Sequence, residues 1–495
     1  MKILLLYPEF PDTFWSFKHA LRFIRKKAGA PPLGLLTVAA LLPAEWEKRL
    51  VDVNVASLTA ADLAWADYAF ISAMVVQRDS ARALITRCKE AGLKVVAGGP
   101  LFTMEQDQFP DVDYFVLNEA ELTLPPFLAD LATGKLQHIY RTSAYPDIRQ
   151  TPAPLWHLAS LKQYETVSIQ LSRGCPFNCD FCNVTALLGH RPRVKEATQI
   201  VAELDKLYAL GWRRSVFFVD DNFIGNKKYI KTEVLPALIK WRKGKVGMAF
   251  NTEVSINLAD DPELMSLMTQ AGFDTVFVGI ETPNEESLVE CNKTQNKGRD
   301  LMESVKRLQR AGLQVQGGFI VGFDSDTPSI FQQQIDFIQR SGIVTAMVGL
   351  LQAPPGTRLY ERLKGEGRVV EGMEGLSGDN VDGSTNIIPK MGLDTLREGY
   401  RTILDHIYAP PFYYERVLTF LREYQPARFR IHLEPQYFLA VARSIGRLGI
   451  RSAERMHYWR LFFWTLFRRP RLFPLAITLA ISGFHFRQVV ELHVG

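Results

Sequence analysis

Cysteine and histidine are scarce in this chain of 495 residues, which contains five cysteines and nine histidines. A small, odd number of cysteines in a long chain argues against a disulfide framework and fits a reducing compartment such as the cytosol. Three of the five lie within eight residues, at Cys175, Cys179 and Cys182, whereas Cys88 and Cys291 stand alone. Since cysteine is scarce elsewhere, three cysteines so close together indicate a metal site.

The chain also has little excess of positive or negative charge and few long apolar runs. The formal net charge is only +5, and nucleic-acid binders usually concentrate basic residues on one face, so we expect no nucleic-acid partner. The apolar run Ile3–Leu6 is too short for a secretory signal. The apolar stretch Leu472–Phe484 has about 13 residues, fewer than the roughly 20 that cross a bilayer. We expect a cytoplasmic protein without a membrane-spanning helix.

Hydrophobic residues are plentiful, at 47% of the chain, and their pattern predicts alternating strands and helices in residues 1–145. Helices are expected at Leu33–Leu42 and Ala81–Ala91. The expected strands are Lys2–Tyr7, Val51–Val55, Tyr68–Ala73, Lys94–Ala97 and Val112–Leu117. Short apolar strands separated by helices predict a parallel sheet covered on both faces. This α/β region is therefore expected to be a doubly wound, Rossmann-like domain that binds its ligand beyond the carboxyl ends of the strands.

A proline-containing linker over residues 146–165 precedes a second alternating series over residues 166–365. Its expected strands are Thr166–Leu171, Ser215–Val219, Met248–Thr252, Thr275–Ile280, Val315–Val321 and Thr345–Leu351. The expected helices include Gln199–Leu210, Pro262–Ala271 and Arg299–Ala311. Six successive β/α units predict a partial (β/α)6 barrel of the TIM type, with its active site at the carboxyl ends of the strands. A loop rich in glycine and aspartate follows over residues 366–393, and residues 394–495 are expected to be helical.

The cysteine cluster directly follows the first strand of the predicted barrel, in the segment SRGCPFNCDFCN at 172–183. Thiolates are soft ligands that suit zinc or iron–sulfur clusters. Three closely spaced thiolates can hold three irons of a [4Fe–4S] cluster and leave the fourth iron open to another ligand. Structural zinc is the alternative, but it usually has four ligands, and His190 is the only nearby candidate for the fourth.

This CxxxCxxC spacing, with an aromatic residue before the last cysteine, resembles the radical S-adenosylmethionine superfamily. The similarity continues at the strand ends, in FVDDNF at 218–223, NTE at 251–253, GIETP at 279–283, GGFIVGF at 317–323 and APPGT at 353–357. The Gly-Gly-Glu motif that the family has after the second strand is replaced here by VDDNF. The resemblance implies that the three cysteines bind a [4Fe–4S] cluster that cleaves S-adenosylmethionine to a 5′-deoxyadenosyl radical. The residues that it places near S-adenosylmethionine or the substrate are Phe181, Asp220, Asp221, Glu253, Glu281, Gly317 and Gly318.

The N-terminal half resembles the cobalamin-binding domains that precede the barrel in one branch of this superfamily. The resemblance rests on PPLGLL at 31–36, SAMVV at 72–76, GGP at 98–100 and NEAE at 118–121. The implied cobalamin contacts are Pro32, Gly34, Ser72, Ala73, Met74, Gly98, Gly99, Glu119 and Glu121. The DxHxxG motif, whose histidine ligates cobalt, is absent, so we expect no protein imidazole on the cobalt. A doubly wound domain with a structural role or another ligand is the alternative.

This architecture implies a cobalamin-dependent radical methyltransferase that acts on an unactivated carbon of a lipid or natural product, and the sequence is similar to bacterial enzymes that methylate hopanoid lipids. Two alternatives stay open. The first is a cobalamin-containing radical enzyme that catalyses an oxidative cyclisation or rearrangement, and the second is a non-catalytic cobalamin- or metal-binding regulator. The expected partners are a small-molecule substrate and an electron donor such as flavodoxin or ferredoxin.

Aromatic residues alternate with arginines near the end of the chain, in MHYWRLFFWTLFRRPRLFP at 456–474. A basic, aromatic-rich amphipathic segment can lie at a membrane surface, which would make the protein peripheral at the inner face of the membrane. A helix packed on the barrel is the alternative that we favour. Contact with a membrane would make a lipid-like substrate more plausible.

Overall fold

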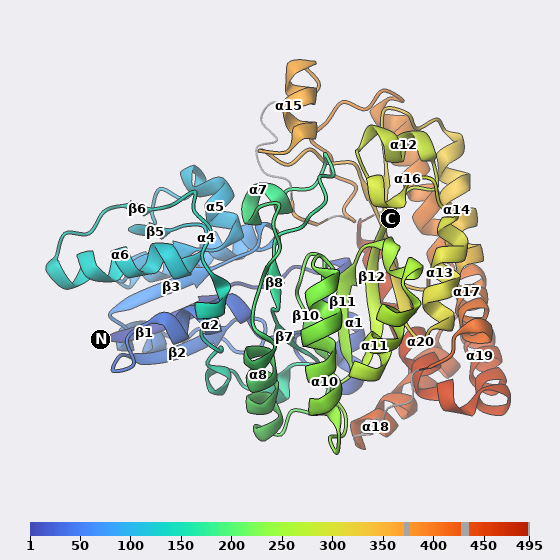
Figure 1. Ribbon diagram of the computed structural model, residues 1–495, viewed down its shortest axis with the longest axis horizontal. Helices are drawn as coiled ribbons and strands as arrows, with labels where there is room; N and C mark the ends of the chain where they lie inside the picture. Colours follow the sequence, from blue (N-terminus) through green and yellow to red (C-terminus); the bar gives the residue numbers. More distant parts are fainter. Residues whose placement is uncertain (371–376, 380, 427–434, 494–495) are drawn as a thin grey trace.

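The computed structural model of the protein describes residues 1–370, 377–379, 381–426 and 435–493. Two parallel six-stranded sheets stand side by side, and a helical region packs against the far side of the second sheet (Figure 1). The expected α/β class is confirmed, with a parallel N-terminal domain, a central partial barrel and helices in the described part of the C-terminal region.

The first sheet has the strand order β2-β1-β3-β4-β5-β6, and all its strands are parallel. Its strands are β1 (Lys2–Tyr7), β2 (Glu47–Asp52), β3 (Tyr68–Ser72), β4 (Lys94–Gly98), β5 (Tyr114–Val116) and β6 (Ile139–Tyr140). Its helices are α2 (Leu33–Leu41), α3 (Ala60–Trp65), α4 (Arg78–Glu90), α5 (Pro100–Glu105) and α6 (Ala120–Thr133). Successive residues of β1 enter two separate buried clusters, Leu4 and Leu6 on one face and Ile3 and Leu5 on the other. A strand that is buried on both faces has apolar residues at successive positions, which is why the run Ile3–Leu6 predicted a strand here.

The predicted second strand is wrong in its bounds. It was expected at Val51–Val55, but β2 begins at Glu47 and ends at Asp52. This strand lies at the edge of the sheet, so its first half is partly exposed and carries charged residues that hide the strand pattern.

The second sheet has the order β7-β10-β11-β12-β13-β14, again with every strand parallel. Its strands are β7 (Val167–Ile169), β10 (Val216–Phe218), β11 (Phe250–Val254), β12 (Phe273–Glu281), β13 (Gln314–Val321) and β14 (Ala346–Leu350). The main helices around it are α8 (Ala197–Ala209), α10 (Leu235–Arg242), α11 (Pro262–Ala271), α12 (Glu285–Glu290), α13 (Leu301–Arg310) and α14 (Ser329–Ser341). Within the described residues β7 does not pair with β14, so the barrel is partial, as expected. The sequence did not predict the short antiparallel hairpin of β8 (Ser172–Arg173) and β9 (Arg193–Val194).

The C-terminal region contains α15 (Arg358–Gly365), α16 (Leu393–Tyr408), α17 (Pro410–Glu423), α18 (Pro435–Ser444), α19 (Arg455–Arg468) and α20 (Phe473–His493). The expectation that no helix reaches membrane-spanning length is wrong. The helical stretch Pro470–Leu492 has 23 residues and is long and apolar enough to cross a bilayer. Polar residues such as His485 prolong the helix beyond the apolar stretch that the sequence showed. Most of this helix is buried against neighbouring helices, as in the core of a soluble protein.

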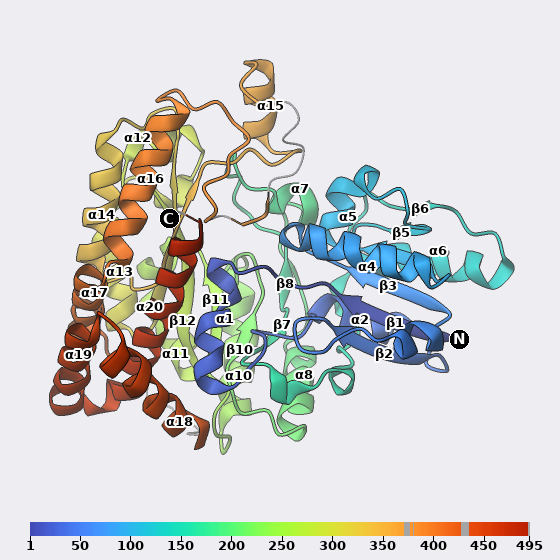
Figure 2. The ribbon, with the colours of Figure 1, turned by 180° about the vertical axis from the view of Figure 1, so that it is seen from behind.

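The N-terminal segment leaves the first domain and packs against the last helix. Helix α1 (Lys18–Leu21) lies beside α20 in the view from behind (Figure 2). The ring of Phe14 stacks on that of Phe486, with centroids 4.3 Å apart. The two ends of the chain therefore share one buried core.

Candidate functional site

The cysteine loop begins where the β8–β9 hairpin opens, just after the first barrel strand. Gly174 has a φ of 92°, and a Cβ there would lie 2.8 Å from the carbonyl oxygen of Gly189, so glycine is required. The amide of Cys175 donates to that carbonyl at 3.3 Å, and the amide of Cys182 donates to the carbonyl of Cys179 at 3.1 Å. All three thiols are free and partly exposed. The hairpin thus presents three neighbouring thiols at the carboxyl end of a barrel strand.

Two aspartates at the end of β10 fix the backbone that leads into this loop. The buried carboxylate of Asp220 accepts hydrogen bonds from the amide of Ser172, from Ser172 Oγ at 2.5 Å and from the amide of Leu171 at 3.3 Å. Burial raises the pKa of Asp220 to about 7. Burial also raises the pKa of Asp221, although the amide of Gly174 donates to its carboxylate. Both aspartates therefore position the cysteine loop, and their contact with S-adenosylmethionine stays a prediction.

Residues 291–296, in which the sequence marked only the isolated Cys291, lie directly against the cysteine loop. The carbonyl of Cys291 accepts a hydrogen bond from the amide of Asp180 at 3.0 Å. Gln295 Nε2 lies 3.6 Å from the sulfur of Cys179 and donates to it. No motif marks this segment in the sequence, because its partners lie more than a hundred residues earlier in the chain.

Lys293, in the same segment, carries a buried ammonium group beside the cysteines. Its Nζ lies 2.5 Å from Oε1 of Glu281, which ends β12. Burial alone would lower the pKa of Lys293, but the charges of Glu281 and Cys179 outweigh burial and raise it. Lys293 is therefore positively charged, and a cation in this position stabilises nearby thiolates. Glu281 is paired with this lysine, and its place near S-adenosylmethionine or the substrate stays a prediction.

Glu253 and Phe181 complete the predicted set on this side of the barrel. Burial raises the pKa of Glu253 to about 8, and the charges of Asp221 and Asp220 add to the effect. Its carboxylate has no hydrogen-bond or ion-pair partner in the part of the chain that the structure describes, so it can accept hydrogen bonds from a ligand. The ring of Phe181 lies 5.7 Å from Nζ of Lys293.

The paired glycines of β13 are buried among aromatic side chains. A Cβ on Gly317 would lie 2.8 Å from the ring of Phe319, and one on Gly318 would lie 2.8 Å from the ring of Phe277. The packing of these two rings against the strand explains why both positions are glycine. Close approach of a ligand to the glycine backbone stays a prediction.

Two glycines at the carboxyl edge of the first sheet lie where a side chain would collide with neighbouring protein atoms. Ser72 pairs with Gly98 in register. A Cβ on Gly98 would lie 2.6 Å from the carbonyl oxygen of Val116, and one on Gly99, whose φ is 91°, would lie 2.5 Å from Ser72 Oγ. Beside them the side chain of Met74 is 47% exposed. Neighbouring protein atoms therefore account for both glycines. The exposed thioether of Met74 lies near the switch point between β1 and β3, where ligands bind, and contact of these residues with corrin stays a prediction.

The remaining residues of the predicted cobalamin set lie close to this edge or on α2. Ala73 is buried, and its carbonyl accepts a hydrogen bond from the amide of Leu101 at 3.0 Å. Pro32 is buried just before the first turn of α2, whereas Gly34 is exposed, with open space where a Cβ would lie. Their contact with cobalamin stays a prediction.

Glu119 and Glu121, where α6 begins, are joined to arginines of the β8–β9 hairpin. Arg173 donates to Glu119 Oε2 at 2.5 Å and to Glu121 Oε1 at 2.8 Å, and Arg193 donates to Glu119 Oε1 at 2.8 Å. All four side chains are largely buried. We call these four residues the interdomain clamp. Because Arg173 lies two residues before Cys175, the clamp ties the cysteine loop to the carboxyl edge of the first sheet. The structure pairs both glutamates with arginine, and their predicted contact with cobalamin stays a prediction.

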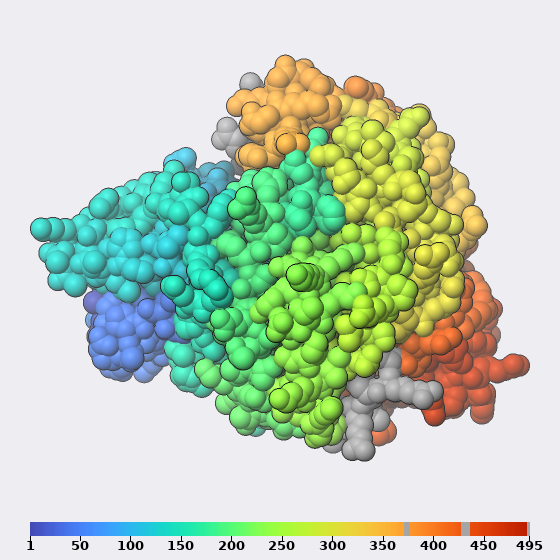
Figure 3. Space-filling view, in the orientation of Figure 1, coloured from blue at the N-terminus to red at the C-terminus, as the bar shows by residue number. Residues whose placement is uncertain are grey.

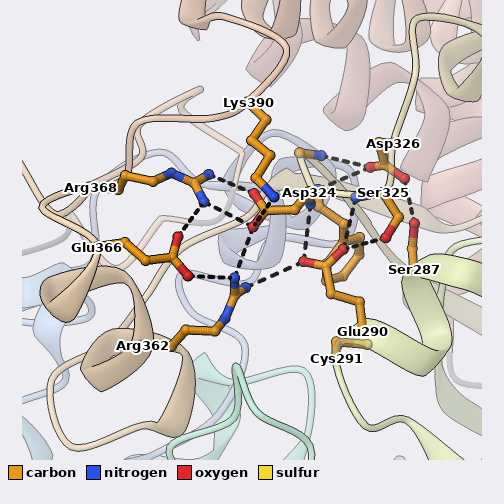
Figure 4. A network of polar contacts seen from close by, with 12 residues as sticks. Ser287, Glu290, Cys291, Asp324, Ser325, Asp326, Arg362, Glu366, Arg368 and Lys390 are labelled. Atoms are coloured by element: carbon orange, nitrogen blue, oxygen red, sulfur yellow. Dashed lines mark hydrogen bonds and ion pairs between the residues drawn. The ribbon is translucent and has the colours of Figure 1, made fainter.

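A second polar network fastens α15 and the loop after it to the barrel (Figure 4). Asp324 accepts hydrogen bonds from Arg362 at 2.8 Å and from Arg368 at 2.6 Å. Burial alone would raise the pKa of Asp324, but these two arginines hold it well below its usual range. Further along the loop, Gly378 packs on the backbone of Val76, because a Cβ there would lie 2.6 Å from the Val76 nitrogen. The described part of this loop therefore spans from the barrel to the first domain.

The chemistry of the donor set fits an iron–sulfur cluster. Soft thiols are adjacent, an amide group donates to one sulfur, and a buried ammonium group balances negative charge. Burial raises the pKa of Cys182 to about 12, so binding of iron must displace protons. Across the described residues, no group of three or more His, Cys, Asp or Glu side chains is arranged around a single metal ion.

Three segments of the chain match known protein families. Residues 26–128 match the B12 binding domain, residues 169–338 match the radical SAM superfamily, and residues 357–494 match a domain of unknown function (DUF4070). The division follows the two sheets and the helical region seen in the structure.

Two relatives match the chain over most of its length and of their own. The chain is 41% identical to the "Uncharacterized methyltransferase sll1242" of Synechocystis sp., covering 100% of this chain and 94% of the relative. It is 33% identical to the "Hopanoid C-2 methylase" of Rhodopseudomonas palustris, covering 94% of this chain and 90% of that one. Among solved structures, the cobalamin-dependent S-adenosylmethionine radical enzyme OxsB has a TM-score of 0.62 at 13% identity, covering 100% of this chain and 79% of OxsB.

Proposed function

The chain belongs to the cobalamin-dependent branch of the radical S-adenosylmethionine superfamily and is a methylase, and we propose that its substrate is a polycyclic lipid methylated at an unactivated carbon. The substrate class is supported by the 33% identical relative, whose name states that it methylates hopanoids at C-2.

The observation that supports this reaction best is the interdomain clamp. It joins the hairpin that carries the cysteines to the start of α6, at the carboxyl edge of the first sheet. A radical methylation needs the hydrogen-abstracting group and the methyl donor at one carbon, so both must face a common space. The clamp brings the two predicted cofactor sites to adjoining edges of the two domains.

The chain supplies positions and charges, whereas the bound cofactors supply the reactive groups. When bound, the cluster with S-adenosylmethionine provides the hydrogen-abstracting radical, and cobalamin provides the methyl group. Cys175, Cys179 and Cys182 would hold the cluster, and Lys293 would balance its negative charge. Glu253 would accept a hydrogen bond from the ammonium group or a ribose hydroxyl of S-adenosylmethionine. Ser72, Gly98 and Gly99 would line the corrin site, with Met74 against the face of the ring.

The partners follow from this chemistry. Each turnover consumes electrons, so a small electron carrier of the flavodoxin or ferredoxin type would reduce the cluster in the reducing cytoplasm. A polycyclic lipid is stored in membranes, so the protein would meet it at a membrane surface as a peripheral protein.

The test is an anaerobic assay of the reconstituted protein with S-adenosylmethionine labelled in its methyl group, cobalamin, a reductant and hopanoid lipids in detergent. Label in the lipid, together with formation of 5′-deoxyadenosine, is the expected result. Cys175→Ala should abolish both products, because the cluster loses a ligand. Formation of 5′-deoxyadenosine and an unlabelled, cyclised or rearranged product would overturn the proposed methylation.

A further inference from the structure

Helix α19 carries a row of aromatic rings that begins at the partly buried Trp459 and ends in two exposed phenylalanines. Trp459, Phe463 and Phe467 follow one another at four-residue intervals and therefore lie on one face of the helix. Their rings stack in succession, with centroids 5.3 Å apart in the first pair and 6.2 Å apart in the second. Phe463 is 48% exposed and Phe467 is 76% exposed. We call these three residues the aromatic row.

The opposite face of α19 is fixed to the protein. Tyr458, Leu461 and Thr465 are buried, and the helix packs against α17 and α20. The exposure of the aromatic row is therefore a property of a firmly packed helix. Met456, exposed by 73%, and Leu466 extend the apolar surface around the row. Contiguous exposed apolar surface of this kind marks an interaction site.

The charge around the aromatic row is positive. Residues 455–472 contain no acidic residue, and the arginines among them that are exposed are Arg455, Arg460, Arg468 and Arg471. Arg460 pairs with Glu415 of α17 at 3.1 Å. Arg468 and Arg471 follow directly after Phe467, at the end of α19 and in the turn that leads to α20. The surface therefore combines aromatic rings with guanidinium groups at their border.

We infer that this face of α19 docks the protein on the surface of an anionic phospholipid bilayer. Aromatic rings sit favourably at the boundary of headgroups and acyl chains, and arginines bind lipid phosphates. The 14 residues of α19 are too few to cross a bilayer, so the helix lies in the plane of the surface. A second copy of the chain is a poorer occupant, because a symmetric contact would set arginine against arginine.

The position of α19 allows such docking. It lies at the outer margin of the helical region, beside α17 and away from the N-terminal domain (Figure 1). The space-filling view shows this region as an orange-red lobe beside the barrel (Figure 3). The lobe belongs to the segment that matches a family of unknown function, so the inference gives that segment a role: it brings the enzyme to the membrane that holds its substrate. The inference rests on the proposed function only for the identity of that substrate.

Sedimentation of the full-length protein with vesicles tests the inference. Vesicles of phosphatidylcholine with phosphatidylglycerol should bind the protein, and vesicles of phosphatidylcholine alone should bind it much less. The double variant Phe463→Ser/Phe467→Ser should lower binding by about tenfold or more, because the inserted apolar area is lost. The double variant Arg468→Gln/Arg471→Gln should lose most of the preference for phosphatidylglycerol and most of the salt dependence. Leu210→Ser is the matched control, since Leu210 is 52% exposed in the turn after α8 and should leave binding unchanged.

Three results would overturn the inference. The first is wild-type protein that stays in the supernatant with anionic vesicles, and the second is equal binding by wild-type protein and the aromatic double variant. The third is a lipid-free dimer that the aromatic double variant abolishes, which would assign the face to a second copy. Circular dichroism and methyl transfer in detergent show whether each variant is folded. Vesicle binding without lipid methylation would refute the proposed substrate and leave the docking surface intact.

Discussion

Arg173 donates a hydrogen bond to Glu121 across the boundary of the two domains, with 2.8 Å between Nη2 and Oε1. Both side chains are largely buried, and Arg173 is joined through Gly174 to the first cysteine of the loop. A buried pair of this kind adds little net stability, but breaking it leaves an uncompensated charge. The pair serves to position the cysteine loop against the edge of the first sheet.

Glu121→Gln should therefore separate radical formation from methyl transfer. The variant should bind iron and cobalamin normally, yet form less methylated product for each 5′-deoxyadenosine, by about tenfold or more, because reactive groups displaced by an ångström react poorly. The measurement is the ratio of the two products in single-turnover assays. Glu105→Gln is the control, since Glu105 forms a similarly buried pair with Arg78 inside the first domain. A ratio that falls equally in both variants would point to general loss of stability.

Lys293→Met should make the cluster harder to reduce. The variant removes a positive charge next to Cys179 and Cys182, so the reduction potential should fall by on the order of 50 mV, which corresponds to about 1 kcal/mol. Redox titration followed by electron paramagnetic resonance gives the value. The double variant Lys293→Met/Glu281→Gln removes opposite charges together and should restore most of the potential. Lys297→Met, an exposed lysine four residues later, should not change it.

Glu253→Gln should weaken binding of S-adenosylmethionine without loss of the cluster. The carboxylate has no partner among the described residues. Burial raises its pKa to about 8, but a bound ammonium group would favour its charged form, so an amide replaces a charge-assisted hydrogen bond by a neutral one and we expect the Kd to rise by about tenfold. Iron and sulfide content should match the wild type. Glu398→Gln on the exposed face of α16 serves as the control. An unchanged Kd would remove Glu253 from the site.

Acid should destabilise the contact between the N-terminal segment and α20. The ring of His485 is buried, with Nε2 3.0 Å from the carbonyl oxygen of Phe14, and burial lowers its pKa from 6.5 to about 4. The unfolded chain takes up this proton below pH 6.5, whereas the folded protein does so only near pH 4. The contribution of neutral His485 to the free energy of unfolding is therefore complete above pH 6.5. It is lost as the pH falls, at up to about 1.4 kcal/mol per pH unit.

Urea denaturation at pH 7 and pH 5 measures this slope. His485→Gln should flatten it, whereas His157→Gln should leave it unchanged, because His157 is exposed. An unaltered slope in His485→Gln would assign the acid sensitivity to other groups.

The features that the sequence predicts best are those encoded within a few residues. Strand Lys2–Tyr7 and helix Pro262–Ala271 were predicted with the bounds that the structure shows, because apolar runs and a proline at the helix start are local signals. The spacing of the cysteines is equally local. The edge strand β2 was misplaced because its first residues, from Glu47 onward, are charged on an exposed edge.

The site depends on pairs that no local pattern marks. Glu121 and Arg173 are 52 residues apart, and Gln295 and Cys179 are 116 residues apart. The resemblance of the NEAE segment to cobalamin-binding domains implied that Glu121 contacts a ligand, and its arginine partner, in another domain, could not be seen from the sequence. Nothing in the sequence indicated that Lys293 is buried at the site, since an isolated lysine after a short helix is ordinarily solvated.

Phe14 stacks on Phe486 of α20. The hydrophobic segment around Phe14 can therefore be buried only after the last helix has been synthesised. A ribosome must release almost the whole polypeptide before this core can close. During translation the N-terminal aromatic residues therefore stay uncovered, and chaperones that hold nascent chains should be needed for high yield. For the same reason, a version truncated before α20 should accumulate as insoluble material, although both sheets would be present.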